Sequence, residues 1–151
     1  MYLKKFGEDF DFVFIDIPRM TNSLSEASNI QVLYYCDVIL IPAIGSRLDV
    51  MSTARFFKIV QDAATKKREL EFEFQILGFL NRETNRKDNQ EAKVVLSENM
   101  NIPMMKASLR ELKLFTSPSL FQSILDSKEG KARFEPFFNE FCNRTIWFCS
   151  F

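Results

Sequence analysis

Two polar side chains stand at the ends of apolar segments, and they are the first candidates for chemistry. Asp16 follows the run 12–15, and Asn81 follows the run 76–80. In α/β proteins, ligands bind at the carboxyl ends of buried strands, so a carboxylate or an amide there is a candidate ligand-binding group. Each residue also has a structural interpretation, Asp16 as a capping or turn residue ahead of Pro18 and Asn81 as a turn residue.

The composition excludes several kinds of site. The sequence has no histidine, which excludes histidine-based zinc sites and serine–histidine or cysteine–histidine catalysis. Its three cysteines form no CxxC pair, so we expect reduced thiols in a cytosolic protein. Twenty basic and twenty acidic residues balance, which gives no general attraction to nucleic acid or anionic membrane. No apolar run is long enough to predict a transmembrane helix.

Three segments have the composition of strands buried on both faces of a sheet. They are mostly apolar and bounded by charges or proline, and they cover residues 10–18, 37–42 and 72–81. A short apolar stretch at 102–105 predicts a fourth strand at an edge of the sheet.

Helical patterns separate and follow these strands. The clearest is an amphipathic helix over about 49–67, which a weak capping-box pattern of Ser46 and Asp49 precedes. Phenylalanines along one side of a helix over 131–143 form an apolar face, and Pro136 predicts a start near Glu135. The other expected helices cover residues 23–35, 90–99, 108–114 and 119–126.

Strands that alternate with helices predict an α/β fold with a mainly parallel sheet flanked by helices. We expect a single domain over residues 1–151, with an apolar tail at 145–151 that packs on the body.

Four motifs resemble the C-terminal part of ATPases of the ParA/MinD type, a deviant Walker family of P-loop NTPases. FDFVFIDIP at 10–18 resembles the Walker B and switch II strand, and CDVILIP at 36–42 resembles the next strand. GSRLDV at 45–50 resembles the following turn and helix start, and GFLNR at 78–82 resembles the strand that ends beside the adenine. Their order and spacing match over about residues 5–143, which implies a partial P-loop NTPase-like fold.

One departure from the family pattern is large. The family begins with a strand that leads into the phosphate-binding sequence KGGVGKT, and none of the four glycines here sits in a GxxxxGK pattern. Because the loop amides and lysine hold the β- and γ-phosphates, a nucleotide would lose its main anchor. The chain starts just before the Walker B-like strand, so we expect a fragment with an exposed sheet edge.

The resemblance implies roles for single residues. Asp16 matches the Walker B aspartate, which contacts Mg²⁺ through water, and Asn81 matches the residue beside adenine. ATP and Mg²⁺ are the implied cofactors, with Asp16 and Asn81 as cofactor-binding residues, Asp16 as the metal residue and no catalytic residue. Asp11 begins the same strand and is interpreted as structural. Asp49 matches a position near the nucleotide at the family's dimer face, although a helix-start role is the simpler interpretation.

The family also implies partners. Homodimers, or self-association, are expected, together with a partition-protein partner. Family members bind DNA non-specifically through basic surface residues, and the spacing of Lys106, Arg110 and Lys113 would place them along one side of a helix. Scattered surface charge is the simpler interpretation in a chain of zero net charge.

Two functions follow as hypotheses. The first is a cytoplasmic ParA-like protein of plasmid partition, chromosome segregation or conjugative transfer that is inactive as an ATPase by itself. The second is a non-catalytic interaction module that binds an intact ATPase or another protein. A receiver-like or flavodoxin-like domain fits less well, because no predicted strand ends in lysine and Glu8, Asp9 and Asp11 lie at the wrong strand end for Asp16.

Overall fold

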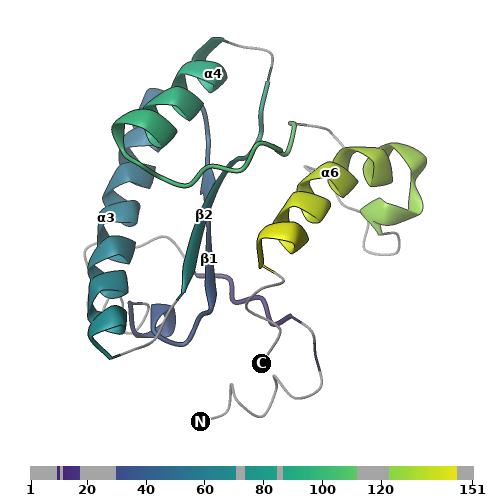
Figure 1. Ribbon diagram of the computed structural model, residues 1–151. Coiled ribbons are helices and arrows are strands. Elements are labelled where there is room, and N and C mark those ends of the chain that lie inside the picture. Colours follow the sequence, from purple (N-terminus) through teal and green to yellow (C-terminus); the bar gives the residue numbers. More distant parts are fainter. Residues whose placement is uncertain are drawn as a thin grey trace.

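Strands and helices alternate along the described part of the chain (Figure 1). The computed structural model describes residues 10, 12–17, 30–70, 74–84, 87–111 and 123–145. A short helical stretch at 30–33 comes before the first strand. The elements are β1 (Val38–Ala43), α3 (Arg47–Glu69), β2 (Gln75–Leu80), α4 (Lys87–Val94), the π-helical turn η1 (Val95–Asn99), the 3₁₀ turn η2 (Ile124–Asp126) and α6 (Lys128–Thr145).

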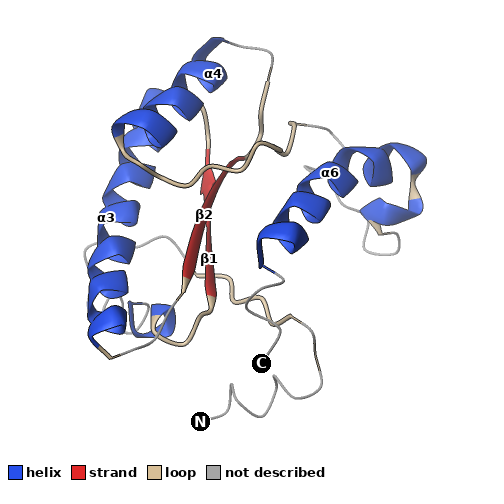
Figure 2. Cartoon of the chain, in the orientation of Figure 1, coloured by secondary structure: helices blue, strands red, loops and turns tan. Residues whose placement is uncertain are grey.

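The two strands β1 and β2 pair in parallel, with Val38 opposite Gln75 and Ala43 opposite Leu80. Successive side chains of a strand point to opposite faces, so each strand contributes to two cores. One core joins β1 to α3, and the other packs Leu77 and Phe79 of β2 against α6. Figure 2 shows α3 and α4 on one side of the strands and α6 on the other. The prediction of parallel strands flanked by helices is confirmed for these two strands.

Helix α3 begins where the sequence predicted it. The Ser46 side chain accepts a hydrogen bond from the Asp49 amide (3.2 Å) and donates one to the Asp49 carboxylate, which satisfies one of the orphan donors of the first turn. Its buried side chains include Phe57, Val60 and Ala63, which recur at helical spacing and face the first core.

Lys67, near the end of α3, is turned inward although its neighbours are exposed. Its side chain is 4% exposed, donates to the Cys36 carbonyl (2.8 Å) and lies 4.8 Å from the centre of the Phe74 ring. Burial lowers the pKa of Lys67, and the nearby Asp37 opposes that effect. This contact ties the end of α3 to the start of β1.

The segment 103–111 lies along the outer side of β2. Gly78 donates to the Pro103 carbonyl (2.9 Å) and accepts from the Met105 amide (2.7 Å), which makes an isolated parallel bridge to Met104. The fourth strand predicted at 102–105 is therefore present as a single bridge at this edge. A Cβ at Gly78 would stand 2.4 Å from the Met104 sulfur, so the Met104 side chain would have to move to admit a larger residue.

The helix predicted over 108–114 is wrong for residues 108–111. These residues are extended, with the Leu109 amide bonded to the Leu80 carbonyl (2.9 Å) and the Glu111 amide bonded to the Glu83 carbonyl (3.0 Å). Backbone groups that pair with the end of β2 are not available for a helix. Residues 112–114 lie outside the described part of the chain.

The strand predicted over 10–18 is wrong for residues 12–17, which form no strand. Phe12 is 37% exposed and Phe14 is 71% exposed, and their rings lie 5.7 and 6.1 Å from the ring of Phe141. A strand buried on both faces needs hydrogen-bonded neighbours. Among the described residues, none forms a backbone hydrogen bond with this segment, so contacts of its side chains decide its course.

Other helix boundaries differ from the expectations in smaller ways. The helix predicted over 90–99 begins earlier, at Lys87, and ends in the turn η1. The predicted start near Glu135 is wrong, because Ser127 caps α6 through the Gly130 amide (2.9 Å) and Pro136 lies inside the helix. Of the segments 23–35 and 119–126, the described residues are helical only at 30–33 and in η2. The tail beyond Thr145 lies outside the described residues.

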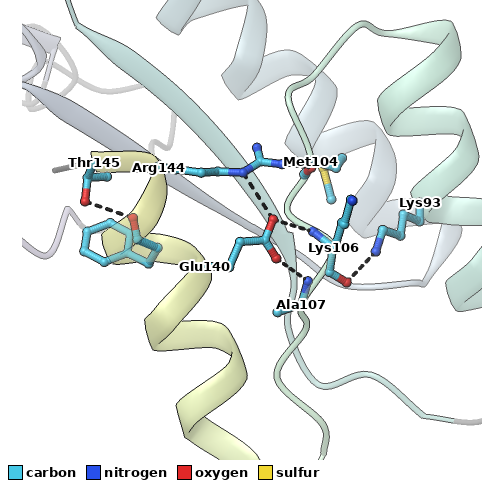
Figure 3. Close-up of polar contacts among 8 residues, drawn as sticks. Lys93, Met104, Lys106, Ala107, Glu140, Arg144 and Thr145 are labelled. Carbon is cyan, nitrogen blue, oxygen red and sulfur yellow. Dashed lines mark hydrogen bonds and ion pairs between the residues drawn. The ribbon is translucent and has the colours of Figure 1, made fainter. Parts of the chain in front are cut away.

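The carboxylate of Glu140 fastens α6 to the loop beside β2 (Figure 3). It accepts the backbone N–H groups of Lys106 (2.8 Å) and Ala107 (2.6 Å) and pairs with the Nε of Arg144 (3.1 Å). Burial raises the pKa of Glu140, but these donors and the charges of Arg144 and Lys93 outweigh that effect and hold the pKa below its usual value.

This geometry predicts that Glu140→Gln destabilises the fold at neutral pH by about 1–2 kcal/mol, because charge-assisted hydrogen bonds are lost. A carboxyl with a lowered pKa stabilises the fold above its unfolded-state value of 4.5, and this contribution is lost as the pH falls below that value. Urea unfolding of both proteins at pH 7 and pH 3 should therefore show a large difference at pH 7 and a small one at pH 3. Glu135→Gln is the control. The Glu135 side chain is exposed, and its ion pair with Lys131 is long, at 4.0 Å, so its loss should change the stability little at either pH. Equal differences at both pH values would contradict the assignment.

Candidate functional site

The carboxyl ends of β1 and β2 lie together and form the candidate site. The Asn81 amide donates to the Ala43 carbonyl (2.8 Å), so the ladder between the strands continues to their last residues. The loops that follow, 44–46 and 81–84, therefore leave the sheet at the same edge. In parallel sheets this is the edge at which ligands bind.

Asn81 lies at this edge, at the end of β2, and is half-buried. Its Oδ1 accepts the N–H of Arg82 (3.0 Å), and Arg82 has a left-handed backbone (φ 54°) that is uncommon for a residue other than glycine. The Nδ2 of Asn81 donates to none of the described residues. Toward a ligand, Asn81 can thus offer both N–H donors of its Nδ2 and the second lone pair of its Oδ1.

Asn89 of α4 connects the two loops at this edge. It is 5% exposed, and its Nδ2 donates to both the carbonyl (2.7 Å) and the hydroxyl (2.9 Å) of Thr84. Its Oδ1 faces Gly45, where a Cβ would stand only 1.8 Å away. The sequence analysis did not identify Asn89; the isolated Gly45 in the turn after a buried strand was the available signal.

Asp49 belongs to the first turn of α3, where its carboxylate and amide both contact Ser46. These contacts favour its interpretation as a helix-start residue over a role at a dimer face.

Asp16 lies in the segment 12–17, and its side chain is exposed. No hydrogen bond or ion pair among the described residues links it to Asn81 or to the loops at the carboxyl edge. In Figure 1 the purple segment 12–17 is drawn at the level of the lower halves of the strands, where they begin.

Mg²⁺ binds to oxygen ligands that several side chains must bring together. Across the described part of the chain, no group of three or more acidic, cysteine or histidine side chains is placed to hold a metal ion. A lone carboxylate such as that of Asp16 is a poor fit to Mg²⁺, an ion that needs near-octahedral oxygen ligands.

The basic residues expected along one helix do not share a helix. Lys106 is in a loop, where its amide bonds to Glu140 and its carbonyl accepts from Lys93 (2.8 Å). Arg110 is in the extended segment beside Glu83, and Lys113 lies outside the described residues. The helical arrangement proposed for DNA contact is therefore wrong for Lys106 and Arg110.

None of the helices in the described ranges has both the length and the apolar character needed to cross a bilayer.

The close approach of α4 to the turn after β1 predicts that Gly45→Ala destabilises the fold by about 1–3 kcal/mol. The new Cβ would stand 2.9 Å from the Cα of Asn89, which is backbone and cannot move away cheaply. Gly78→Ala is the matched control, because its nearest atoms belong to the side chains of Met104 and Ile102. Thermal unfolding should show the larger loss for Gly45→Ala, and the reverse order would contradict this account.

Comparisons with known proteins give a structural likeness without a sequence match. No protein-family model matches this chain, and no curated protein matches it. Among the solved structures that match is a chain described as "Partition Protein", with a TM-score of 0.53 and 18% sequence identity. The likeness covers 76% of this chain and 30% of that one, so this chain spans less than a third of the length of its structural neighbour. At this identity the comparison shows that the two chains share a fold.

Proposed function

We propose that this chain acts in DNA partition as a ParA-like protein that does not hydrolyse ATP by itself. The observation that carries the proposal is the structural likeness to a partition protein over 76% of the chain. Because the chain spans 30% of that neighbour, its role is proposed as that of a part and not of the whole protein.

Two of the four sequence motifs support the ParA-like assignment through their place in the fold. CDVILIP includes most of β1, and GFLNR ends β2 and continues to Arg82. They lie in parallel strands that are adjacent, with GSRLDV forming the turn and first residues of α3 between them. The FDFVFIDIP motif gives less support, because residues 12–17 form no strand.

The absence of hydrolysis is proposed from the sequence and from the residues at the site. Phosphoryl transfer depends on positioning the phosphates and the metal, and the sequence has no glycine-rich loop to do so. If the chain binds ATP, the resemblance assigns Asn81 to the base and Asp16 to Mg²⁺, and no contact among the described residues brings these two side chains together. We place this role in the cytoplasm, in keeping with the free thiols of Cys36 and Cys142.

A second candidate function is a non-catalytic module that binds an intact ATPase. Exposed apolar side chains favour it, and the aromatic ones among them are Phe10, Phe12, Phe14, Tyr35 and Phe138. The two functions differ in a measurable way, because the module would change the ATP hydrolysis rate of an intact ParA-type enzyme when the two are mixed.

The first prediction is that the purified chain with ATP and Mg²⁺ releases no more phosphate than a blank. The reason is the missing phosphate anchor. Phosphate release would be followed continuously, with Asp16→Ala measured beside the unchanged chain. Hydrolysis that disappears in Asp16→Ala would contradict the proposal.

The second prediction concerns partition directly. Deleting the gene from its host should raise the loss rate of the plasmid or chromosome that it serves, and a supplied copy of the gene should restore retention. A copy that carries Asp16→Ala should restore retention equally well, because the proposed role needs no hydrolysis. Loss rates that are unchanged after deletion would overturn the partition role.

A further inference from the structure

The segment 12–17 touches both faces of the sheet. Ile17 packs against the core between β1 and α3. The rings of Phe12 and Phe14 lie 5.7 and 6.1 Å from the ring of Phe141, which belongs to the core on the α6 side. Figure 1 shows this segment at the level of the lower halves of the strands. Because β2 occupies one edge of β1, the segment passes from one face to the other at the outer edge of β1.

The outer edge of β1 is of the kind that proteins cover. The ladder to β2 begins with the Gln75 amide on the Asp37 carbonyl (2.8 Å), and alternate residues of a parallel strand bond to the same neighbour. The N–H groups of Val38 and Leu40 therefore point away from β2, and no backbone hydrogen bond among the described residues reaches them. Residues 38–44 include no charge, and an uncharged edge with unpaired backbone groups is a template for pairing with another chain.

We propose that residues 12–17 form a strap that shields the outer edge of β1 from other chains. Covering a sheet edge with a loop is one of the ways in which proteins prevent edge-to-edge pairing. No backbone hydrogen bond joins the strap to another described residue, so its side chains hold it in place. The strap can therefore leave the edge without breaking the ladder between β1 and β2, which makes it a removable cover. This inference does not depend on the proposed role in partition.

Two accounts of the exposed rings of the strap make opposite predictions. Phe12 is 37% exposed and Phe14 is 71% exposed. If these rings are an apolar patch that recruits other molecules, their removal lowers self-association. If they anchor a cover over β1, their removal raises self-association, because the edge is then open to another chain.

The test is sedimentation velocity of the full chain with both anchoring rings removed, as Phe12→Ala/Phe14→Ala. Phe138→Ala is the matched control, because it removes a ring that is 43% exposed and stacks on Phe134 of its own helix. The double variant should associate at a concentration about tenfold lower than the unchanged chain, because several backbone hydrogen bonds become available at the edge. Phe138→Ala should not shift this concentration downward.

A third substitution places the association on the edge itself. Val38→Pro, added to the double variant, removes an outward N–H and keeps the ladder to β2, so it should reverse the added association. If the double variant loses its cooperative thermal transition, Phe14→Ala alone serves for the same comparison, with a smaller shift in the same direction.

Hydrogen exchange at a concentration where the proteins are monomeric gives an independent measurement. The Leu40 amide should exchange severalfold faster in the double variant than in the unchanged chain, because the strap no longer covers it. The Ile39 amide, bonded to β2, should not change. A double variant that associates no more than the unchanged chain would overturn the proposal. Added association that survives Val38→Pro, or equal exchange at Leu40, would also overturn it.

Discussion

The parallel ladder between β1 and β2 is the constraint on which the other contacts depend. It uses one edge of each strand and fixes which side chains face α3 and which face α6. Because side chains alternate, a slip of one residue would move every apolar side chain of a strand to the wrong face. The apolar composition of both strands allows burial on two sides, and the helices supply it.

The two faces are held in different ways. On the α3 face, contact is almost wholly apolar, with Lys67 closing one end on the Cys36 carbonyl. On the α6 face, aromatic packing of Phe137 on Phe79 (4.8 Å between ring centres) is joined by the carboxylate of Glu140. The Glu140 carboxylate binds the backbone amides of Lys106 and Ala107, which belong to the segment that pairs with β2. The position of α6 is therefore coupled to the position of that segment.

The edge where both strands end shows how a site and a packing requirement can share the same residues. Asn89 holds the loop after β2 through Thr84 and touches the turn after β1 at Gly45. Any ligand bound by Asn81 would therefore meet loops whose spacing α4 sets. Arg82, with its left-handed backbone, belongs to the same arrangement, and its amide donates to the Asn81 oxygen.

The sequence by itself determined the elements whose signals are local. The apolar runs of β1 and β2, the cap at Ser46 and the helical stripe of α3 each depend on residues close together in the chain, and the structure has all of them. Tertiary structure decided the segments whose hydrogen-bonding partners are distant. Residues 12–17 have the composition of a strand but form no backbone hydrogen bond with the described residues, and residues 108–111 have a helical pattern but pair with the end of β2. The position of Asn89 against Gly45 also follows from the packing of α4, because a polar residue on a short helix carries no local signal of the loop it will meet.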